Sequence, residues 1–428
     1  MSMINTKRIA VVGGGAAGML AAGTALAMGA EVCVFEHRNR TLLKLGITGK
    51  GRCNLTNSAT VPELIENVVH NPRFLYTAFS RFSAQDTMTL FENLGVPLKT
   101  ERGRRVFPVS DKASDIVKAL RGYVSGAEIR FSHVRGIRIG DGHVLGVEAD
   151  GFYPADAVIL ATGGRSYPVT GSDGSGFALA QAAGHTVTPL TPSLVPLSSP
   201  SPLCPMMQGL SLKNVSLRIV KRDGGRVLYE DFGEMMFTHF GITGPMVLSA
   251  SAHLQSEKLS SLDAVIDLKP ALDEKTLDAR LLSDFTAQSN RNFENALGGL
   301  LPAKMILPML RYTEISPTKK VHTVTREERK RLLSALKGFT LPLSGFRPIE
   351  EAIVTSGGVS VKEVSPATMM SKKCKGLFFA GEMLDVDAYT GGYNLQIAFS
   401  TGYLAGMSAA SYINEQDEGE PHVLQDRS

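Results

Sequence analysis

The spacing of apolar residues changes twice between Ile9 and Phe35. The segment IAVVGGGAAGMLAAGTALAMGAEVCVF begins with a β-branched run, continues as an alanine-rich stretch and ends in a second β-branched run. Short apolar runs of this kind are typical of buried strands, and the alanine-rich part is long enough for a helix. Glycines at positions 13, 14, 15, 18, 23 and 29 argue against a signal peptide or one continuous membrane helix. The pattern predicts a buried βαβ unit.

Three later segments extend this unit. Short alternating strands are predicted for Val134–Val147 around the turn sequence Gly140–Gly142, and Asp156–Gly164 predicts a buried strand that ends in a glycine pair. Near the C-terminus, Lys375–Gly406 contains a strand, a GE turn, an acidic loop and glycines that open a helix at about Tyr393. These alternating strands and helices predict an α/β fold.

A proline-rich stretch interrupts the α/β pattern. Six prolines fall between residues 188 and 205, a density that no central helix or strand tolerates. Beyond them, residues 214–232 predict a β-hairpin around Asp223-Gly224, and the pattern becomes helical over residues 270–336. The sequence therefore predicts an inserted domain in which strands precede helices.

Composition narrows the class of protein. Of the 428 residues, 43% are hydrophobic and 20% are charged, as in an ordinary globular protein. The 45 basic and 41 acidic residues give a net charge of +4, which is too balanced to indicate a nucleic-acid or membrane partner. The four cysteines form no CxxC pair, which suits a reducing compartment. We therefore expect a cytoplasmic protein with no membrane insertion, nucleic-acid partner or metal site.

The turn inside the βαβ unit carries a phosphate-binding spacing. Gly13, Gly15 and Gly18 form G-x-G-x-x-G directly after the first strand and at the start of the helix. These glycines permit a tight turn, close approach of the backbone to a pyrophosphate and close contact between helix and strand. The second strand ends at Glu36, whose carboxylate can accept hydrogen bonds from an adenosine ribose. The spacing predicts an adenine dinucleotide and leaves NAD and FAD both open.

The segments downstream favour FAD. Simple NAD dehydrogenases continue with further βαβ units, whereas a β-meander followed by an ILATGG strand resembles the FAD domains of the glutathione-reductase-like superfamily. The C-terminal segment resembles the part of such flavoproteins that closes over the flavin. Backbone N–H groups at the start of its helix would face N1 and O2 of the isoalloxazine ring. Asp385 or Asp387 would hold the ribityl hydroxyls, or each lies in a solvated turn.

The motifs together resemble one bacterial family. The chain contains, in matching order, KLGITGKGRCNLTN, ATGGRSYPVTGSDGSGFALAQAAGH, PSLVPL, MMFTHFGITGPMVLSAS and GEMLDVDAYTGGYNLQIAFSTGYLAG. They are similar to those of bacterial NAD(P)/FAD-dependent oxidoreductases of the aminoacetone oxidase family, a group that includes a bile-acid-inducible flavoprotein. The resemblance implies a Rossmann-like FAD-binding domain of the glutathione-reductase-like superfamily, interrupted by a mixed β then α insert. The expected parts are residues 1–188 and 347–413 of the FAD-binding domain, the insert 189–346 and a polar, flexible tail 414–428.

The loop GITGKGRCNLTN, from Gly46 to Asn57, has three interpretations. A Walker A motif would need glycine in place of Lys44 and serine or threonine in place of Gly51. A dithiol site would need a second cysteine beside Cys53. The interpretation that remains is a flavin-facing loop. In this loop Lys50 or Arg52 offers positive charge to a pyrophosphate or to reduced flavin, Asn54 and Asn57 hold the loop, and Cys53 is structural.

The resemblance implies a set of FAD-binding residues on these motifs. They are Gly13, Gly15, Ala16, Ala17, Gly18, Glu36, Lys44, Thr48, Gly49, Lys50, Gly51, Arg52, Cys53, Asn54, Ala161, Thr162, Gly163, Gly381, Glu382, Asp385, Asp387, Gly391, Gly392, Tyr393, Asn394 and Leu395.

His239 is the candidate catalytic residue. It lies between aromatic residues in the glycine-bounded stretch FTHFGITGP of the insert. Histidine carries protons near neutral pH, so we expect His239 to line the substrate side of the flavin. The alternative is a packed histidine that is hydrogen-bonded to backbone.

The predicted function is that of an FAD-dependent oxidoreductase acting on a small molecule, because flavin carries the redox chemistry that the protein positions. NAD(P)H is considered as a transient electron donor, although the sequence has no second G-x-G-x-x-G unit to bind it. Two alternatives stay open. One is an oxidase or quinone-linked dehydrogenase of a small amine, and the other is a flavin-bearing RNA-associated or regulatory protein.

Overall fold

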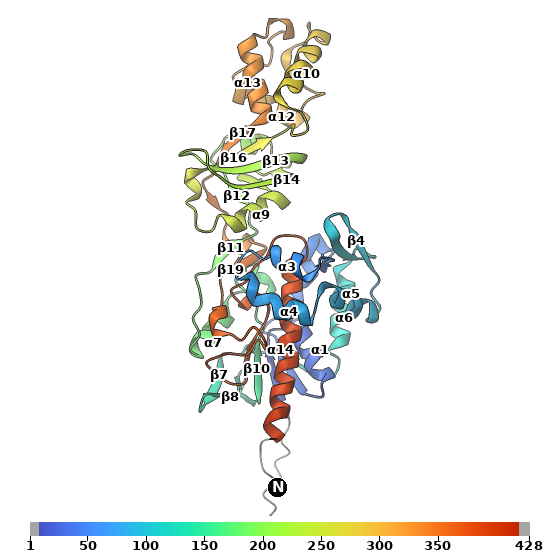
Figure 1. Cartoon of the computed structure of the whole chain (residues 1–428), viewed down its shortest axis with the longest axis vertical. Helices are drawn as coiled ribbons and strands as arrows, with labels where there is room; N and C mark the ends of the chain where they lie inside the picture. The colour runs from blue at the N-terminus through green and yellow to red at the C-terminus, as the bar shows by residue number, and fades with distance from the viewer. Residues whose placement is uncertain (1–7, 419–428) are drawn as a thin grey trace, which may run out of the picture. The chain divides into compact units, whose positions relative to one another are not determined.

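The computed structural model describes residues 8–418, which belong to two compact units (Figure 1). Unit 1 combines the chain up to Pro192 with the chain from Ala352 onward, and unit 2 is the segment Ser193–Glu351 between them. The sequence predicts these boundaries after residues 188 and 346, four and five residues earlier. A single insert therefore interrupts the first unit.

Unit 1 is built on a five-stranded parallel sheet in the order β20-β10-β1-β2-β6. Strand β1 lies between β10 and β2, so the strand that precedes the glycine-rich turn is central. Its residues are buried, as expected for a parallel sheet covered on both faces. Helix α1 (Ala16–Ala27) links β1 to β2 and confirms the predicted βαβ unit. The strands are β1 (Arg8–Val12), β2 (Glu31–Phe35), β6 (Glu128–Arg130), β10 (Ala157–Leu160) and β20 (Leu377–Phe379).

Helix α14 (Tyr393–Glu418) begins where the sequence predicts and packs along α1 through residues without side chains (Figure 1). A methyl group added at Gly402 would lie 2.4 Å from the carbonyl oxygen of Ala17, and one at Gly406 would lie 2.3 Å from that of Ala21. Because residues four apart lie on the same helix face, the contact repeats one turn later on both helices. This close approach fixes the start of α14 relative to the start of α1.

Smaller elements surround the parallel sheet. The predicted hairpin around Gly140–Gly142 is confirmed, since β7 and β8 pair antiparallel and β9 extends them. A second small sheet has the order β3-β5-β4, and β11 pairs with β19. The bounds are α2 (Leu43–Ile47), β3 (Thr56–Asn57), α3 (Val61–Glu66), α4 (Tyr76–Arg81), α5 (Ala84–Asn93), β4 (Leu98–Glu101), β5 (Arg105–Pro108), α6 (Ala113–Tyr123), β7 (Gly136–Gly140), β8 (His143–Glu148), β9 (Phe152–Pro154), α7 (Ser175–Ala182), β11 (Thr191–Ser193) and β19 (Val354–Ser356).

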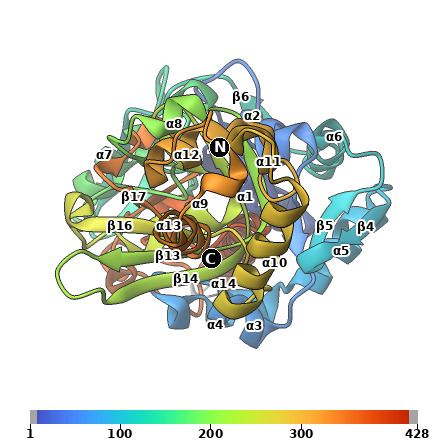
Figure 2. The same ribbon diagram turned by 90° about the horizontal axis from the view of Figure 1, so that it is seen from above.

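Unit 2 contains a seven-stranded sheet in the order β17-β16-β13-β14-β15-β12-β18, and α-helices directly follow three of its strands, β12, β15 and β16. The long β13–β14 hairpin confirms the turn predicted around Asp223-Gly224 and is visible in Figure 2. The elements are β12 (Leu197–Ser198), α8 (Leu203–Met206), β13 (Ser211–Lys221), β14 (Val227–Phe237), β15 (Gly241–Thr243), α9 (Pro245–His253), β16 (Leu262–Asp267), α10 (Glu274–Ala287), α11 (Phe293–Ala296), α12 (Ala303–Thr313), α13 (Arg326–Lys337), β17 (Phe339–Pro342) and β18 (Gly345–Phe346).

Helix α14 extends further than the sequence suggests. The predicted tail 414–428 is wrong for its first residues, because α14 continues to Glu418. The rest of that segment, residues 419–428, lies outside the described residues. Among residues 8–418, no helix combines the length and the apolar character needed to cross a bilayer.

We expect Gly406→Ala to lower the free energy of unfolding of unit 1 by about 1–3 kcal/mol, because the added methyl group forces α14 away from α1. Chemical denaturation followed by circular dichroism measures this change. Gly122→Ala in α6 is the matched control: no atom lies within 4 Å of its added methyl group. That variant should be as stable as the wild type or more stable, and equal effects of the two substitutions would contradict the packing argument.

Candidate functional site

A cavity opens at the carboxyl ends of the central strands of unit 1. Its lining includes residues 12–17 after β1, residues 35–37 after β2 and residues 161–163 after β10. Open α/β sheets bind ligands at this edge. About 1320 Å³ of the cavity is filled by no protein atom, part of it open to solvent. The position of the cavity beside the glycine-rich turn suits a dinucleotide.

The three glycines of the G-x-G-x-x-G turn, at one wall of this cavity, differ in what a side chain at each position would contact. A methyl group at Gly13, where φ is +109°, would lie 2.4 Å from the carbonyl oxygen of Ala161. One at Gly18 would lie 1.9 Å from the carbonyl oxygen of Gly13, whereas one at Gly15 would meet no atom within 4 Å. Gly13 and Gly18 are therefore required by packing, and Gly15 leaves space beside the backbone for a ligand.

Helix α1 points its N-terminus into the same space. Its N-cap residue is Gly15, which has no side chain to cap the first N–H groups. Uncapped N–H groups and the helix dipole favour an anion such as a pyrophosphate.

Glu36 is fixed at the neighbouring strand end. Its Oε2 accepts a hydrogen bond from Gly14 N at 3.0 Å, and its Oε1 accepts one from Arg38 N at 2.8 Å. The residue is 8% exposed and lines the cavity. A carboxylate oxygen accepts more than one hydrogen bond, so Glu36 can also receive the hydroxyls of a ribose.

Three buried hydroxyls in the cavity wall have no hydrogen-bond partner within residues 8–418. They belong to Thr162, which the sequence predicted, and to Ser132 and Ser172, which it did not. Buried hydroxyls without a partner are rare in folded proteins. A polar ligand in the cavity would satisfy them.

An ion pair between two segments that are far apart in the sequence lies in the cavity wall. Lys44 Nζ lies 2.8 Å from Glu382 Oε2 and donates to Ser166 Oγ at 2.8 Å. Glu382 Oε1 accepts from Ser166 Oγ at 3.0 Å and from Thr355 N at 2.8 Å. The sequence predicted Lys44 and Glu382 as separate FAD-binding residues and not as a pair. Their pairing, and the roles of Ser166 and Thr355, depend on tertiary contacts between segments that no local motif connects.

The start of α14 forms the far wall. Asn394 and Leu395 line the cavity, and the Asn394 side chain holds the acidic loop by accepting from Ala388 N at 3.0 Å and donating to Ala388 O at 2.7 Å. Gly392 is required by packing, because a methyl group there would lie 2.3 Å from the carbonyl oxygen of Thr56.

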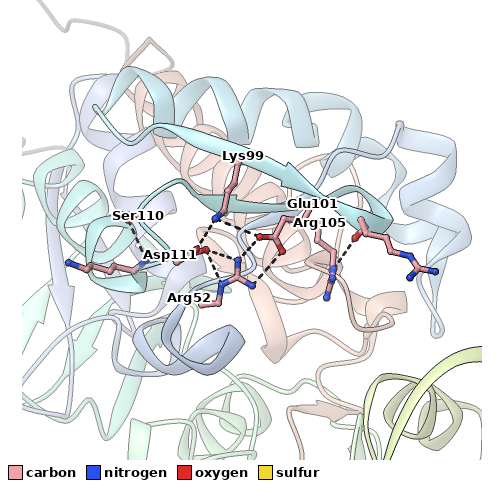
Figure 3. A network of polar contacts seen from close by, with 8 residues as sticks. Arg52, Lys99, Glu101, Arg105, Ser110 and Asp111 are labelled. Carbon is pink, nitrogen blue, oxygen red and sulfur yellow. Dashed lines mark hydrogen bonds and ion pairs between the residues drawn. The ribbon is translucent and has the colours of Figure 1, made fainter. Parts of the chain in front are cut away.

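The loop that follows Lys44 is tied to the small sheet β3-β5-β4 (Figure 3). Arg52 Nη2 lies 2.5 Å from Glu101 Oε1 and 2.6 Å from Asp111 Oδ1, and its guanidinium stacks 4.2 Å from the ring centroid of Phe107. Lys99 adds a contact of 2.7 Å to Asp111. This placement gives no support to the expectation that Arg52 supplies charge to a pyrophosphate.

Cys53 lies in the same loop and is fully buried. Burial raises the pKa of its thiol to about 12. A thiol with that pKa stays protonated near neutral pH, so it is neither a nucleophile nor a thiolate donor. This agrees with the structural role predicted for Cys53.

The FAD-binding residues predicted from the sequence fall into two groups, those that line the cavity and those that do not. Those that do are Gly13, Gly15, Ala16, Ala17, Glu36, Lys44, Thr48, Ala161, Thr162, Gly163, Glu382, Asn394 and Leu395. Those outside the lining are Gly18, Gly49, Lys50, Gly51, Arg52, Cys53, Asn54, Gly381, Asp385, Asp387, Gly391, Gly392 and Tyr393.

His239 belongs to unit 2, in the turn between β14 and β15. Its exposed ring packs edge-on against Phe240, with the ring centroids 5.0 Å apart. Its role in proton transfer stays a prediction.

Comparison with known proteins shows the family to which this chain belongs. The family model described as HI0933-like protein Rossmann domain matches residues 7–408. The chain belongs to this FAD-binding family, whose members are FAD-dependent oxidoreductases. The 3-dehydro-bile acid delta(4,6)-reductase of Clostridium scindens is 32% identical to it, over 94% of this chain and 99% of the relative. The ribosomal RNA dihydrouridine synthase of Escherichia coli is 29% identical, over 92% of this chain and 95% of the relative.

Two solved structures share the fold of this HI0933-like protein. A flavocytochrome c3 fumarate reductase superposes with a TM-score of 0.51 at 17% identity, covering 96% of this chain and 79% of that one. The 3-ketosteroid-delta4-(5alpha)-dehydrogenase of Rhodococcus jostii RHA1 gives a TM-score of 0.51 at 17% identity, covering 96% and 98%. Both support the Rossmann-like FAD-binding α/β fold predicted from the sequence.

The cavity fits FAD. The pyrophosphate would lie at Gly15 and the α1 N-terminus, the adenosine ribose at Glu36, and further polar groups at the unpartnered Thr162 and Ser172 hydroxyls.

We expect Gly15→Ala to weaken FAD binding by about tenfold or more, or about 1.4 kcal/mol, because the methyl group enters the space beside the α1 N-terminus. The φ of −85° at this position suits alanine, so the variant should fold normally. Isothermal titration of the FAD-free protein measures the change. Gly151→Ala, whose methyl group also meets no atom within 4 Å, should bind FAD like the wild type. Equal affinity in all three proteins would remove Gly15 from the site.

We also expect Cys53 to resist thiol reagents in the folded protein, since with a pKa of about 12 only about 10⁻⁴ of the thiol is ionised at pH 8. Mass spectrometry after brief alkylation measures this, with the denatured protein as the reactive control. Rapid labelling of native Cys53, or loss of flavin reduction in Cys53→Ser, would restore a redox role.

Proposed function

We propose that this protein reduces a carbon–carbon double bond conjugated to a carbonyl group, with FAD as its cofactor. The observation that carries the proposal is the pair of curated relatives, which span nearly the whole chain. One is named for reduction of the 4 and 6 positions of a 3-dehydro bile acid. The other is named for synthesis of dihydrouridine, which is uridine with its ring C5–C6 double bond saturated. Both names describe addition of two hydrogens to a bond conjugated to a carbonyl.

The residues of unit 1 have two tasks in this reaction. The α1 N-terminus and Glu36 bind and orient the adenine dinucleotide part. The Lys44–Glu382 pair and Asn394, which holds the acidic loop, fix the cavity wall against which the flavin and the substrate are positioned. When bound, FAD supplies hydride transfer.

The substrate class has two candidates. The sequence favours a small molecule without naming it, and the bile-acid relative supports a small enone. A uracil base in RNA is the second candidate, because the dihydrouridine synthases of Escherichia coli and Haemophilus influenzae are 29% and 28% identical. The balanced net charge favours a small molecule over RNA as the substrate. Amine oxidation has no counterpart in the names of these relatives.

An anaerobic half-reaction experiment tests the proposal. The FAD-loaded protein is titrated with NADH and NADPH, and we expect one of them to bleach the visible flavin absorbance. Protein reduced chemically is then mixed with a 3-oxo-Δ4 steroid or with a uridine-containing rRNA fragment. Recovery of oxidised flavin together with a product heavier by two hydrogens supports an ene-reductase and names its substrate. Recovery with oxygen or a quinone alone would contradict it.

A further inference from the structure

His70 is held by two side chains from other parts of unit 1. Its Nδ1 contacts Asp387 Oδ1, and Ser356 Oγ lies 3.3 Å from both atoms. The backbone supports this contact, since Val69 N donates to Asp387 O at 2.8 Å and Val68 bridges Ala388. Asp387 is 1% exposed, whereas the His70 side chain is 36% exposed. A buried carboxylate thus anchors an imidazole that faces solvent.

This contact fixes which nitrogen of His70 is available. A carboxylate at Nδ1 keeps a proton there, so Nε2 is the nitrogen that gains and loses a proton. Within residues 8–418, Nε2 has no hydrogen-bond partner. The same arrangement orients a histidine for proton transfer in hydrolytic enzymes.

The His70–Asp387 pair lies beside the cavity. Val386, which precedes Asp387, lines the cavity, and so does Val354, two residues before Ser356 on β19. His70, Ser356 and Asp387 themselves are not lining residues. The loop that contains Asp387 is held by Asn394, a lining residue at the start of α14. The pair therefore lies next to the segment that the sequence predicts to close over the flavin.

We propose that His70, oriented by Asp387, is the proton donor of the reduction. The inference rests on the proposed function. When bound, reduced FAD would supply the hydride for the carbon farther from the carbonyl. His70 gives the proton from Nε2 of its imidazolium to the carbon next to the carbonyl, where the former π electrons form the second C–H bond. The neutral imidazole then regains a proton from water. Asp387 is a positioning residue, because it acts through His70.

The charges around His70 favour this role. The hydrogen bond with Asp387 raises the pKa of His70, burial opposes that shift, and the charges of Asp387 and Asp385 add to it. Burial in turn raises the pKa of Asp385, which weakens its contribution at low pH. A raised pKa keeps His70 protonated over a wider range near neutrality. The rate of proton donation should therefore fall as the pH rises through that pKa.

Rapid mixing of chemically reduced, FAD-loaded enzyme with the enone substrate tests this role. In His70→Gln we expect flavin reoxidation to be about 10²–10³-fold slower, with unchanged FAD binding and unchanged substrate affinity. In Asp387→Asn we expect the inflection of the pH profile to move to lower pH. His143→Gln is the matched control, a half-buried histidine on β8 whose Nδ1 lies near the Tyr412 hydroxyl, and should behave like the wild type.

NMR titration of the His70 imidazole gives a readout independent of turnover. We expect a higher pKa in the wild type than in Asp387→Asn. Wild-type reoxidation rates in His70→Gln, or equal imidazole pKa values in the two proteins, would overturn the inference. If the wild type itself reduces no enone, the proposed function fails and the proton-donor role falls with it. That result is distinct from a defect confined to His70→Gln.

Discussion

Backbone contacts without intervening side chains hold unit 1 together at the place where the cavity forms. Gly13 lies against Ala161 of the neighbouring strand, Gly18 lies against Gly13, and Gly402 and Gly406 lie against carbonyl oxygens of α1. A side chain at any of these positions would separate β1, α1 or α14, which carry much of the cavity lining. Close-packed interiors do not absorb such a change smoothly. The cavity therefore depends on a few small residues that touch no ligand.

Charged side chains then fix the loops on this frame. Lys44 and Glu382 are 338 positions apart in the chain and lie 2.8 Å apart in space. Arg52 is likewise bound to Glu101 and Asp111, each more than forty residues away. Such pairs contribute little net stability once desolvation is counted, but they specify one arrangement of the groups that they join. The cavity walls are thus set before any ligand enters, which lowers the ordering cost of binding.

The sequence predicted what depends on short-range chemistry. Glycine spacing, the acid at Glu36 and the helix start at Tyr393 are each encoded within a few residues, so the parallel sheet and much of the cavity lining followed. The sequence did not predict contacts between residues that are far apart along the chain. Arg52 was predicted to offer charge to a pyrophosphate or to reduced flavin because its acidic partners, Glu101 and Asp111, lie 49 and 59 residues further along the chain. His70 was overlooked as a site because Asp387, which orients it, is 317 residues away.

All of the residues that line the cavity belong to unit 1, including those contributed from beyond the insert. Binding of the dinucleotide part can therefore be understood from one unit alone, with its own hydrophobic core. Unit 2 has a separate core and none of the lining residues, so its sequence is free of the constraints that the glycine contacts impose. Function resides in sites carried by a fold rather than in the fold itself. Relatives named for substrates as unlike as a bile acid and ribosomal RNA resemble this chain to similar degrees, 32% and 29%. A cofactor site confined to one unit offers a physical reason, because changes elsewhere in the chain can alter the substrate without disturbing the flavin.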